Sequence, residues 1–416
     1  MANELRTLRT LLFSRGSLSV YLPSFLVATG EGAILPTLPV TATDLGAGIA
    51  LAGLVTGLIL IGEVIGDLPS GWVVSRLGEN HSMITGAAVM LAGALLCLCA
   101  NTLVLFSAGV FLMGLSTAVF ALARHTLLTV TVPTDIRARA LSLLGGTFRA
   151  GYFLGPFIAA AVIAVSGTQM VFLIPIVACA TTVVVLLILP DPAVVGYAGA
   201  TPVRVHPEPT GVRTSQSAPA RRGLFRTIHE YWGKLARMGT GAVAIGLLRS
   251  SRQTILPLWA VHLNLDAAHT SLIMGVAGAV DFALFYTPGQ IMDRFGRAWS
   301  AVPSLIGLGL LHIALPLSGD IVSFSAIAIL MSVANGIGSG ILMTLGADLA
   351  PRDDPAPFLG AWRFFGDSGN AAAPFIISGL TAVAGLALPA VAVGALGLGG
   401  AILMARFIPR FVPPSP

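Results

Sequence analysis

Twelve long apolar stretches, separated by short polar segments, restrict this chain to very few folds. A helix needs roughly 20 mainly apolar residues to cross about 30 Å of hydrocarbon, and stretches of that kind recur along the whole sequence. They lie near residues 18–40, 49–72, 82–99, 102–131, 138–165, 170–189, 239–262, 268–292, 300–317, 321–350, 358–384 and 388–408. We therefore predict an all-α polytopic membrane protein with twelve transmembrane helices.

The charge content is too low for a water-soluble surface. Asp, Glu, Lys and Arg make up 10% of the 416 residues and hydrophobic residues make up 55%, whereas soluble proteins carry about 25% charged residues. This composition excludes an ordinary cytosolic enzyme, a nucleic-acid-binding protein and a disordered chain. The cysteines, Cys97, Cys99 and Cys179, lie within apolar stretches. Their odd number and spacing fit neither a disulfide framework nor a zinc site, so we predict no metal.

The basic residues predict the orientation in the lipid bilayer. All but four of the 23 Lys and Arg residues fall at the termini, in a central polar segment or in the loops after even-numbered spans. Arg124 is placed at the cytoplasmic end of the fourth span in this prediction. Because positive residues stay on the cytoplasmic side, we expect both termini in the cytoplasm and the protein in the plasma (inner) membrane.

The central polar segment divides the chain into three predicted parts. Residues 1–189 form an N-terminal six-helix bundle, 190–238 a cytoplasmic linker, and 239–416 a C-terminal six-helix bundle. The linker is rich in Pro, Ser, Thr and Arg, as flexible connections are. Its end predicts a short helix on the membrane surface, because apolar residues recur there at helical spacing opposite charged ones: Leu224, Phe225, Ile228, Trp232, Leu235 and Met238.

An internal repeat relates the two bundles. A shift of 218 residues, the distance from Pro39 to Pro257, also superposes further glycines, prolines and loop charges without a gap. We therefore expect two pseudo-symmetric bundles of the same orientation. Parallel six-helix repeats with a site at their interface form a secondary-transporter architecture. The superposed pairs include Gly57 and Gly275, Gly71 and Gly289, Arg76 and Arg294, Gly78 and Gly296, and Gly151 and Gly369.

Three short motifs carry a resemblance to a known family. The loop after the eighth span reads G-Q-I-M-D-R-F-G-R (289–297), its counterpart after the second span reads G-W-V-V-S-R-L-G-E (71–79), and the fifth span contains G-Y-F-L-G-P (151–156). In these motifs the chain resembles the major facilitator superfamily over essentially its full length, and the third resembles the drug:proton antiporter branch. The chain departs from the pattern in the first loop, where Ser75 replaces the Asp and Glu79 replaces the final Arg. It also departs in the fourth span, where residues 110–114 lack the Arg usual in that branch.

The resemblance implies that the two loops latch one state of the transport cycle. Gly71 and Gly289 would let helices approach closely, while Arg76 and Arg294 would hold helix ends through carbonyls or a carboxylate. Alternatively, the arginines only satisfy the preference for positive charge inside. The predicted gating residues are Gly71, Arg76, Gly78, Gly289, Asp293, Arg294, Gly296 and Arg297.

The fifth-span motif has two interpretations of its own. Gly151, Gly155 and Pro156 would bend or thin the fifth helix against a partner, or they serve helix packing alone, since G-x-x-x-G also arises from close packing.

Charged residues within the spans are the candidates for chemistry, since each costs on the order of 2.5–3.5 kcal/mol there. The carboxylates are candidates for proton coupling, because carboxyl groups in a low-dielectric site protonate closer to neutral pH; they are Glu31, Glu63, Asp67, Asp281 and Asp367. The arginines are Arg149, Arg249, Arg252 and Arg363. The 218-residue shift pairs Glu31 with Arg249, Glu63 with Asp281, and Arg149 with Asp367, so we expect these residues to line a shared central cavity or the interface between the halves.

Each of these assignments has an alternative. Every carboxylate could instead form a structural salt bridge with one of the four arginines. The substrate-cavity candidates Arg149, Arg249 and Arg363 either bind an anionic substrate or neutralise the acids. His125, His262 and His312 are scattered and are expected to pack rather than to relay protons.

We expect a monomeric secondary active transporter that exports small amphipathic or drug-like molecules in exchange for protons, by alternating access and without a cofactor. The alternatives are a transporter of an organic anion or other metabolite that uses the cavity arginines, and a membrane receptor or scaffold. The sequence has no G-x-x-x-x-G-K-[ST] loop, no catalytic motif and no basic stripe for nucleic acid. It names neither the substrate nor the direction of transport.

Overall fold

Helices make up all the regular structure of the described residues. The computed structural model describes residues 15–131, 134–189, 229–284, 287–351 and 355–412. Contacts divide the chain into two compact units, and residues 265–275 cluster with the N-terminal one. The N-terminal unit holds α2 (Arg15–Ile34), α3 (Leu38–Asp44), α4 (Ile49–Leu77), α5 (Glu79–Leu98), α6 (Leu103–Thr131), α7 (Thr134–Ser166), η1 (Thr168–Phe172) and α8 (Leu173–Ile188). The remaining helices are α11 (Trp232–His262), α12 (Ala267–Ala283), α13 (Thr287–Phe295), α14 (Ala298–Ala314), η2 (Leu315–Leu317), α15 (Ile321–Ile337), α16 (Ile341–Leu349), α17 (Pro355–Ala384) and α18 (Ala387–Phe411).

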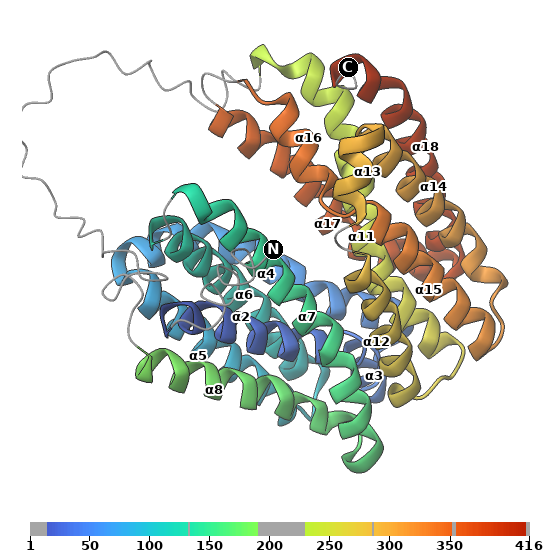
Figure 1. Cartoon of the computed structure of the whole chain (residues 1–416). Helices are drawn as coiled ribbons and strands as arrows, with labels where there is room; N and C mark the ends of the chain where they lie inside the picture. The colour runs from blue at the N-terminus through green and yellow to red at the C-terminus, as the bar shows by residue number, and fades with distance from the viewer. Residues whose placement is uncertain (1–14, 132–133, 190–228, 285–286, 352–354, 413–416) are drawn as a thin grey trace, which may run out of the picture. The chain divides into compact units, whose positions relative to one another are not determined.

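The fifth-span glycines bring α7 into contact with the backbone of α2 (Figure 1). A Cβ atom added at Gly155 would lie 2.5 Å from the backbone nitrogen of Ala33, and one added at Gly151 would lie 2.8 Å from the carbonyl oxygen of Phe25. Pro156 lies inside α7, which continues past it as one helix. The motif therefore packs two helices together, as small residues do in membrane proteins.

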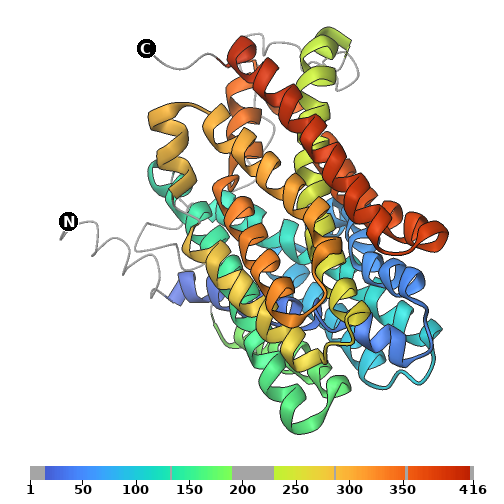
Figure 2. The same ribbon diagram turned by 90° about the vertical axis from the view of Figure 1, so that its right-hand side faces the viewer.

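The two units repeat one packing pattern (Figures 1 and 2). In the N-terminal unit α2 packs against α7 and α8, and α5 packs against α6 and α8. In the C-terminal unit α11 packs against α17 and α18, and α14 packs against α15 and α18. These pairs occupy equivalent places in the 218-residue repeat.

Three of the predicted spans are interrupted helices. The first bends by 45° between α2 and α3, and the eighth by 43° between α12 and α13. The tenth is broken between α15 and α16 at Gly338–Gly340, where Gly340 has a φ of +77°. A backbone with positive φ ends a helix, and glycine adopts it without strain. The hydropathy pattern predicts each of these spans as one continuous helix, so the three interruptions are seen only in the structure.

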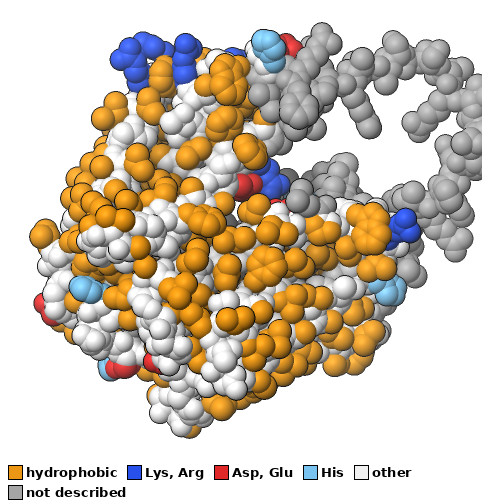
Figure 3. Space-filling view, turned by 180° about the vertical axis from the view of Figure 1, so that it is seen from behind, with side chains coloured by type: hydrophobic (Ala, Val, Ile, Leu, Met, Phe, Trp, Pro, Cys, Tyr) orange, Lys and Arg blue, Asp and Glu red, His pale blue; other side chains and the backbone are white. Residues whose placement is uncertain are grey.

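The number of helices agrees with the predicted spans. Over the described residues, eight helices are long and apolar enough to cross a membrane, and the count rises to ten if each bent pair is one span. The other two predicted spans correspond to α11 and α17, which are 31 and 30 residues long and carry charges in their interiors. Apolar side chains are also spread over the whole described part of the face in Figure 3, as is typical of a surface in contact with lipid.

The described part of the predicted surface helix belongs to α11 instead of forming a separate helix. Trp232, Leu235 and Met238 form the first turns of α11, and Leu235 and Met238 are fully buried. Leu235 and Met238 therefore pack inside the C-terminal unit, whereas the Trp232 side chain is 57% exposed. The helix α11 begins at Trp232, seven residues before the predicted boundary at 239. Leu224, Phe225 and Ile228 lie outside the described residues.

The contact between α7 and α2 predicts that Gly155→Ala destabilises the protein. The added methyl group must push the two backbones apart, and overpacking of this kind costs about 1–3 kcal/mol. We expect a lower apparent melting temperature of the purified protein in detergent. Gly145→Ala is the matched control on the same helix, because a Cβ there meets no atom within 4 Å. Equal melting temperatures for the two variants would contradict this account of the motif.

Candidate functional site

Glu31 is a buried carboxylate in the middle of the predicted first span. Its side chain is 1% exposed. Both carboxylate oxygens accept hydrogen bonds: Oε1 from the Thr117 hydroxyl on α6, and Oε2 from the Tyr152 hydroxyl on α7 at 2.8 Å. Two neutral donors on two other helices thus stabilise the charged form of an acid that has lost its contact with water.

The helix packing described above positions this network. Gly32 follows Glu31 directly, and a Cβ at Gly32 would lie 2.8 Å from the Cα atom of Tyr152. The α2 and α7 backbones therefore touch at the level of the carboxylate. This proximity brings the Tyr152 hydroxyl within hydrogen-bonding reach of Glu31.

Arg124 lies in this region of the N-terminal unit, near the C-terminal end of α6. It is an interior residue of α6, within the apolar span Leu103–Leu128. Its guanidinium carbon lies 3.8 Å from the centre of the Phe148 ring, a cation–π contact. The side chain also interacts electrostatically with Glu31 and Glu63. The fourth helix thus does carry a basic residue inside the span, ten positions after the stretch 110–114.

The other predicted acids lie in different environments. Glu63 is half-buried on α4, and Asp67, one turn later, is exposed. Asp367 is exposed on α17, where it interacts electrostatically with Arg363 one turn before it. Arg149 is half-buried on α7. Within the N-terminal unit, the structure gathers hydrogen-bond partners around Glu31.

A second polar network, in the C-terminal unit, surrounds Asp281. Arg252 on α11 donates to one oxygen of Asp281 at 2.6 Å, and Asn335 on α15 donates to the other at 2.9 Å. Arg252 also donates to the Ser332 hydroxyl at 2.6 Å. Asp281 therefore links α12 to α11 through an ion pair and to α15 through a hydrogen bond.

Arg249 and His312 extend the polar contacts of α11. Arg249 donates to the carbonyl oxygen of Gly338, where α15 ends. His312 is fully buried on α14, with Nδ1 2.8 Å from the Leu308 carbonyl oxygen and Nε2 3.1 Å from the Ser251 hydroxyl. Since a carbonyl only accepts, Nδ1 carries the proton and Nε2 accepts from the hydroxyl.

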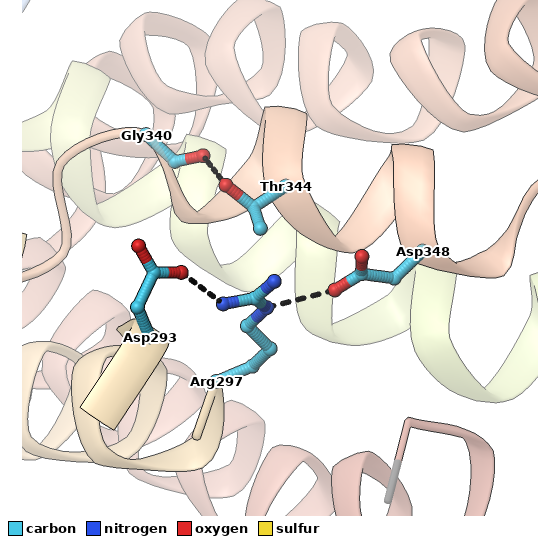
Figure 4. A network of polar contacts seen from close by, with 5 residues as sticks. All are labelled: Asp293, Arg297, Gly340, Thr344 and Asp348. Atoms are coloured by element: carbon cyan, nitrogen blue, oxygen red, sulfur yellow. Dashed lines mark hydrogen bonds and ion pairs between the residues drawn. The ribbon is translucent and has the colours of Figure 1, made fainter. Parts of the chain in front are cut away.

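The second loop motif, which covers the C-terminal part of α13 and the turn after it, contains an ion-pair cluster around Arg297 (Figure 4). The guanidinium donates to Asp348 on α16 at 2.8 Å and to Asp293 on α13 at 3.1 Å. The hydrogen bond to Asp348 is the main cause that raises the pKa of Arg297, so the residue stays charged at any physiological pH. Arg297 thereby ties the end of α13 to the end of α16.

The close helix approach predicted at Gly71 and Gly289 is not seen among the described residues. A Cβ at either glycine would meet no described atom within 4 Å. Glycine is required instead at the turns, where Gly78 and Gly296 have φ values of +75° and +93°.

Arg76 and Arg294 each contact an aromatic ring of their own segment. Arg76 and Arg294 lie 5.4 Å from the neighbouring Trp72 and Phe295 rings. At the second loop it is Arg297 that forms ion pairs, with Asp293 and Asp348. In the first loop, Ser75 and Glu79 stand where the second has Asp293 and Arg297, so that copy lacks the residues for an equivalent cluster.

Sequence reasoning missed the neutral members of both networks. Thr117, Tyr152, Ser332 and Asn335 carry no charge, and the search for charges within spans passed over them. A signal was present: the 218-residue shift that pairs Glu31 with Arg249 also pairs Thr117 with Asn335. Polar residues at both copies of a mid-span position indicate a site in each half.

Comparisons with known proteins agree with this architecture. A family model described as the Major Facilitator Superfamily matches residues 20–374. A multidrug resistance protein of Escherichia coli is 34% identical over 121 residues, which are 29% of this chain and 31% of that protein. A "probable multidrug-efflux transporter" of Mycobacterium tuberculosis is 29% identical over 131 residues, 32% of this chain and 28% of that protein. The matches thus span less than a third of the length of these relatives.

A solved structure extends the match to nearly the whole chain. A POT family transporter in complex with a thioalcohol-conjugated peptide has a TM-score of 0.77 at 12% identity, covering 97% of this chain and 98% of that one. At this identity the likeness shows the fold alone. Together with the family match, it confirms the predicted fold class and places the chain among transporters rather than enzymes.

The unequal exposure of the two acids around Arg297 predicts unequal effects on stability. Asp348 is 27% exposed and Asp293 is 81% exposed, and exposed ion pairs contribute little because water and salt screen them. We expect Asp348→Asn to cost up to about 1 kcal/mol and Asp293→Asn less than about 0.5 kcal/mol. Thermal unfolding in detergent at low and high salt measures both, and a larger loss for Asp293→Asn would be the contrary result.

Proposed function

The chain belongs to the Major Facilitator Superfamily, and from this premise we propose that it exports small amphipathic or drug-like molecules in exchange for protons. Secondary transporters of this kind alternate between two states, and the coupling ion must bind in one and leave in the other. The proposal needs a group near the middle of the membrane that gains and loses a proton.

Glu31 is the observation that carries the proposal. A carboxylate with 1% exposure in the middle of a span is costly when charged, and binding a proton removes that cost. The Thr117 and Tyr152 hydroxyls favour the charged form, and so does the nearby guanidinium of Arg124. The competition between burial and these partners suits a site that exchanges a proton, provided that a conformational change alters the contacts.

The partners of Glu31 explain how proton binding to it would affect the neighbouring helices α4, α6 and α7. Its two donors come from α6 and α7, and Arg124 on α6 also interacts with Glu63 on α4. Protonation of Glu31 would weaken its contacts with both helices at once. We assign Glu63 and Asp67, which share one face of α4, to the same coupling system.

The direction of transport and the cargo rest on the relatives. The matched proteins of Escherichia coli and Mycobacterium tuberculosis are named for multidrug resistance and multidrug efflux. For this chain we propose the same class of cargo. We further propose that the protein is a monomer in the plasma (inner) membrane. Both termini would lie in the cytoplasm, because the basic residues gather in the loops after even-numbered spans.

The proposal predicts that Glu31→Gln abolishes transport driven by a pH gradient. The amide keeps the size of the side chain and cannot exchange a proton. In inverted membrane vesicles with an acidic lumen, we expect uptake of a panel of cationic, neutral and anionic amphipathic dyes to fall to the level of vesicles without the protein.

The matched control is Glu230→Gln, which makes the same change at an exposed position outside the network. It should transport like the unmodified protein. Both variants are first compared for amount in the membrane and for melting temperature. Gradient-driven uptake that survives in a well-folded Glu31→Gln protein would rule out Glu31 as the coupling residue.

A further inference from the structure

Four basic side chains gather at the end of the C-terminal unit where α11 begins and α18 ends. Lys234 and Arg237 lie in the first two turns of α11, and Arg406 and Arg410 lie in the last two turns of α18. All four are exposed. Figure 3 shows Lys and Arg side chains gathered at one end of the described surface, beside apolar ones. This end of the unit therefore concentrates positive charge.

The packing of α11 against α18 brings two of these side chains to one aromatic ring. A Cβ added at Gly400 would overlap the Cβ atom of Ala244, so the two helices are in close contact there. Two turns nearer the basic end, the guanidinium carbons of Arg237 and Arg410 lie 5.9 and 5.8 Å from the centre of the Phe407 ring. Both contacts are cation–π contacts. Phe407 thus holds one arginine of each helix beside it.

The adjacent residues of α11 have a similar composition. Nζ of Lys234 lies 5.7 Å from the centre of the Tyr231 ring. That ring stands edge-on to Phe358 of α17, with 5.7 Å between the ring centres, and the Trp232 side chain is 57% exposed. Trp and Tyr are enriched where hydrocarbon meets headgroups, and Lys and Arg extend their charged ends to the same level. This surface is therefore suited to contact with lipid headgroups.

The two helices supply no acid to balance these charges. The sequence has no Asp or Glu in residues 231–262 or 387–412, and the nearest acid along the chain is Glu230. Among the described residues, no ion pair is formed by any of the four basic side chains. A negatively charged ligand therefore complements this surface.

Exposed apolar side chains on α18 lead to the basic residues. Leu396 and Ile402 are 54% and 69% exposed. Ile402, Arg406 and Arg410 follow one another at intervals of four residues, so they lie along one side of the helix. At 1.5 Å per residue, Arg410 is about 12 Å beyond Ile402 along the axis. A ligand with an apolar chain and an anionic head can therefore contact both parts of this side.

We propose that an anionic phospholipid binds at this basic cluster, which consists of Lys234, Arg237, Arg406, Phe407 and Arg410. Its phosphate lies against the guanidinium groups beside Phe407, because arginine offers phosphate several N–H donors in one plane. Its acyl chains lie along the exposed apolar side chains of α18. The site goes beyond the proposed transport function and depends neither on the cargo nor on proton coupling.

The test measures lipid binding by the purified full-length protein in detergent. The melting temperature is followed while phosphatidylglycerol, phosphatidylcholine with the same acyl chains, or inorganic phosphate is added. We expect phosphatidylglycerol to reach half of its effect at a concentration about tenfold lower than phosphatidylcholine, since basic residues at a membrane surface attract anionic lipids. Inorganic phosphate should have no effect, because it has no apolar chain to contact α18.

Variants separate a defined site from general surface charge. The double variant Arg237→Gln with Arg410→Gln should remove most of the preference for phosphatidylglycerol. Phe407→Leu keeps every charge but removes the ring that holds the arginines, and it should weaken the binding of phosphatidylglycerol severalfold. The matched control is Arg76→Gln with Arg294→Gln, which removes two exposed arginines that contact rings elsewhere. The control should keep the preference.

Four results would each overturn the site. They are equal effects of the two lipids on the unmodified protein, an equal loss of preference in the two double variants, unchanged lipid binding by Phe407→Leu, and stabilisation by inorganic phosphate alone. The second indicates general attraction between basic residues and anionic lipid, and the fourth indicates an anion site that needs no lipid. All proteins are first compared by melting temperature without added lipid.

A fallback keeps the test decisive if the double variant of the cluster folds poorly. The single variant Arg410→Gln, in the last turn of α18, then replaces it, with Arg294→Gln as the matched control. No transport is measured in these experiments. Failure of the Glu31 test therefore leaves the lipid site standing, and failure of the lipid test leaves the proposed function standing.

Discussion

The hydrocarbon core of the membrane contains no water that could hydrogen-bond to polar groups. Polar groups within the spans of this chain must therefore find their hydrogen-bond partners inside the protein. Helices satisfy their own backbone, and wherever a helix is interrupted another donor must be supplied. At the end of α15 Arg249 donates to the Gly338 carbonyl, and at the end of α2 the Thr37 hydroxyl donates to the Ile34 carbonyl at 2.8 Å. Charged side chains obey the same rule: Glu31 and Asp281 each hold two hydrogen-bond donors drawn from other helices.

Duplication explains why polar groups recur at equivalent depths, and divergence explains why they differ. The two copies share helix pairings, turn glycines and mid-span polar positions. They differ in the sign of the central charge, with Glu31 in one half and Arg249 in the other. The loop clusters diverge in the same way, since Arg297 has its two acids and the first copy has Glu79 in its place. One scaffold thus holds two different chemistries.

Hydropathy and the repeat predicted the helices and their order, because contact with lipid requires mainly apolar residues along the whole length of a span. Hydrogen-bond partners depend instead on which helices touch and at what register, so the contacts of Glu31 with Thr117 and Tyr152 required the structure. Gly71 and Gly289 were assigned to helix contact from a motif, but open space surrounds both. The sequence does mark the break of the tenth span by the glycines of G-I-G-S-G, 336–340.

No side chain larger than hydrogen fits at Gly62 or Gly114, since a Cβ at either would lie within 2.3 Å of a carbonyl oxygen. Because α4 and α6 touch there, substitutions at Gly62 and Gly114 in the N-terminal half would force the two helices apart. Over their described residues, α12 and α15 are not packed in this way, and Val280 and Ser332 occupy the equivalent positions. Substitutions there change volume and polarity without forcing two backbones apart. Adaptation to a new cargo is therefore least restricted in the C-terminal half, while the glycine-packed half preserves the scaffold.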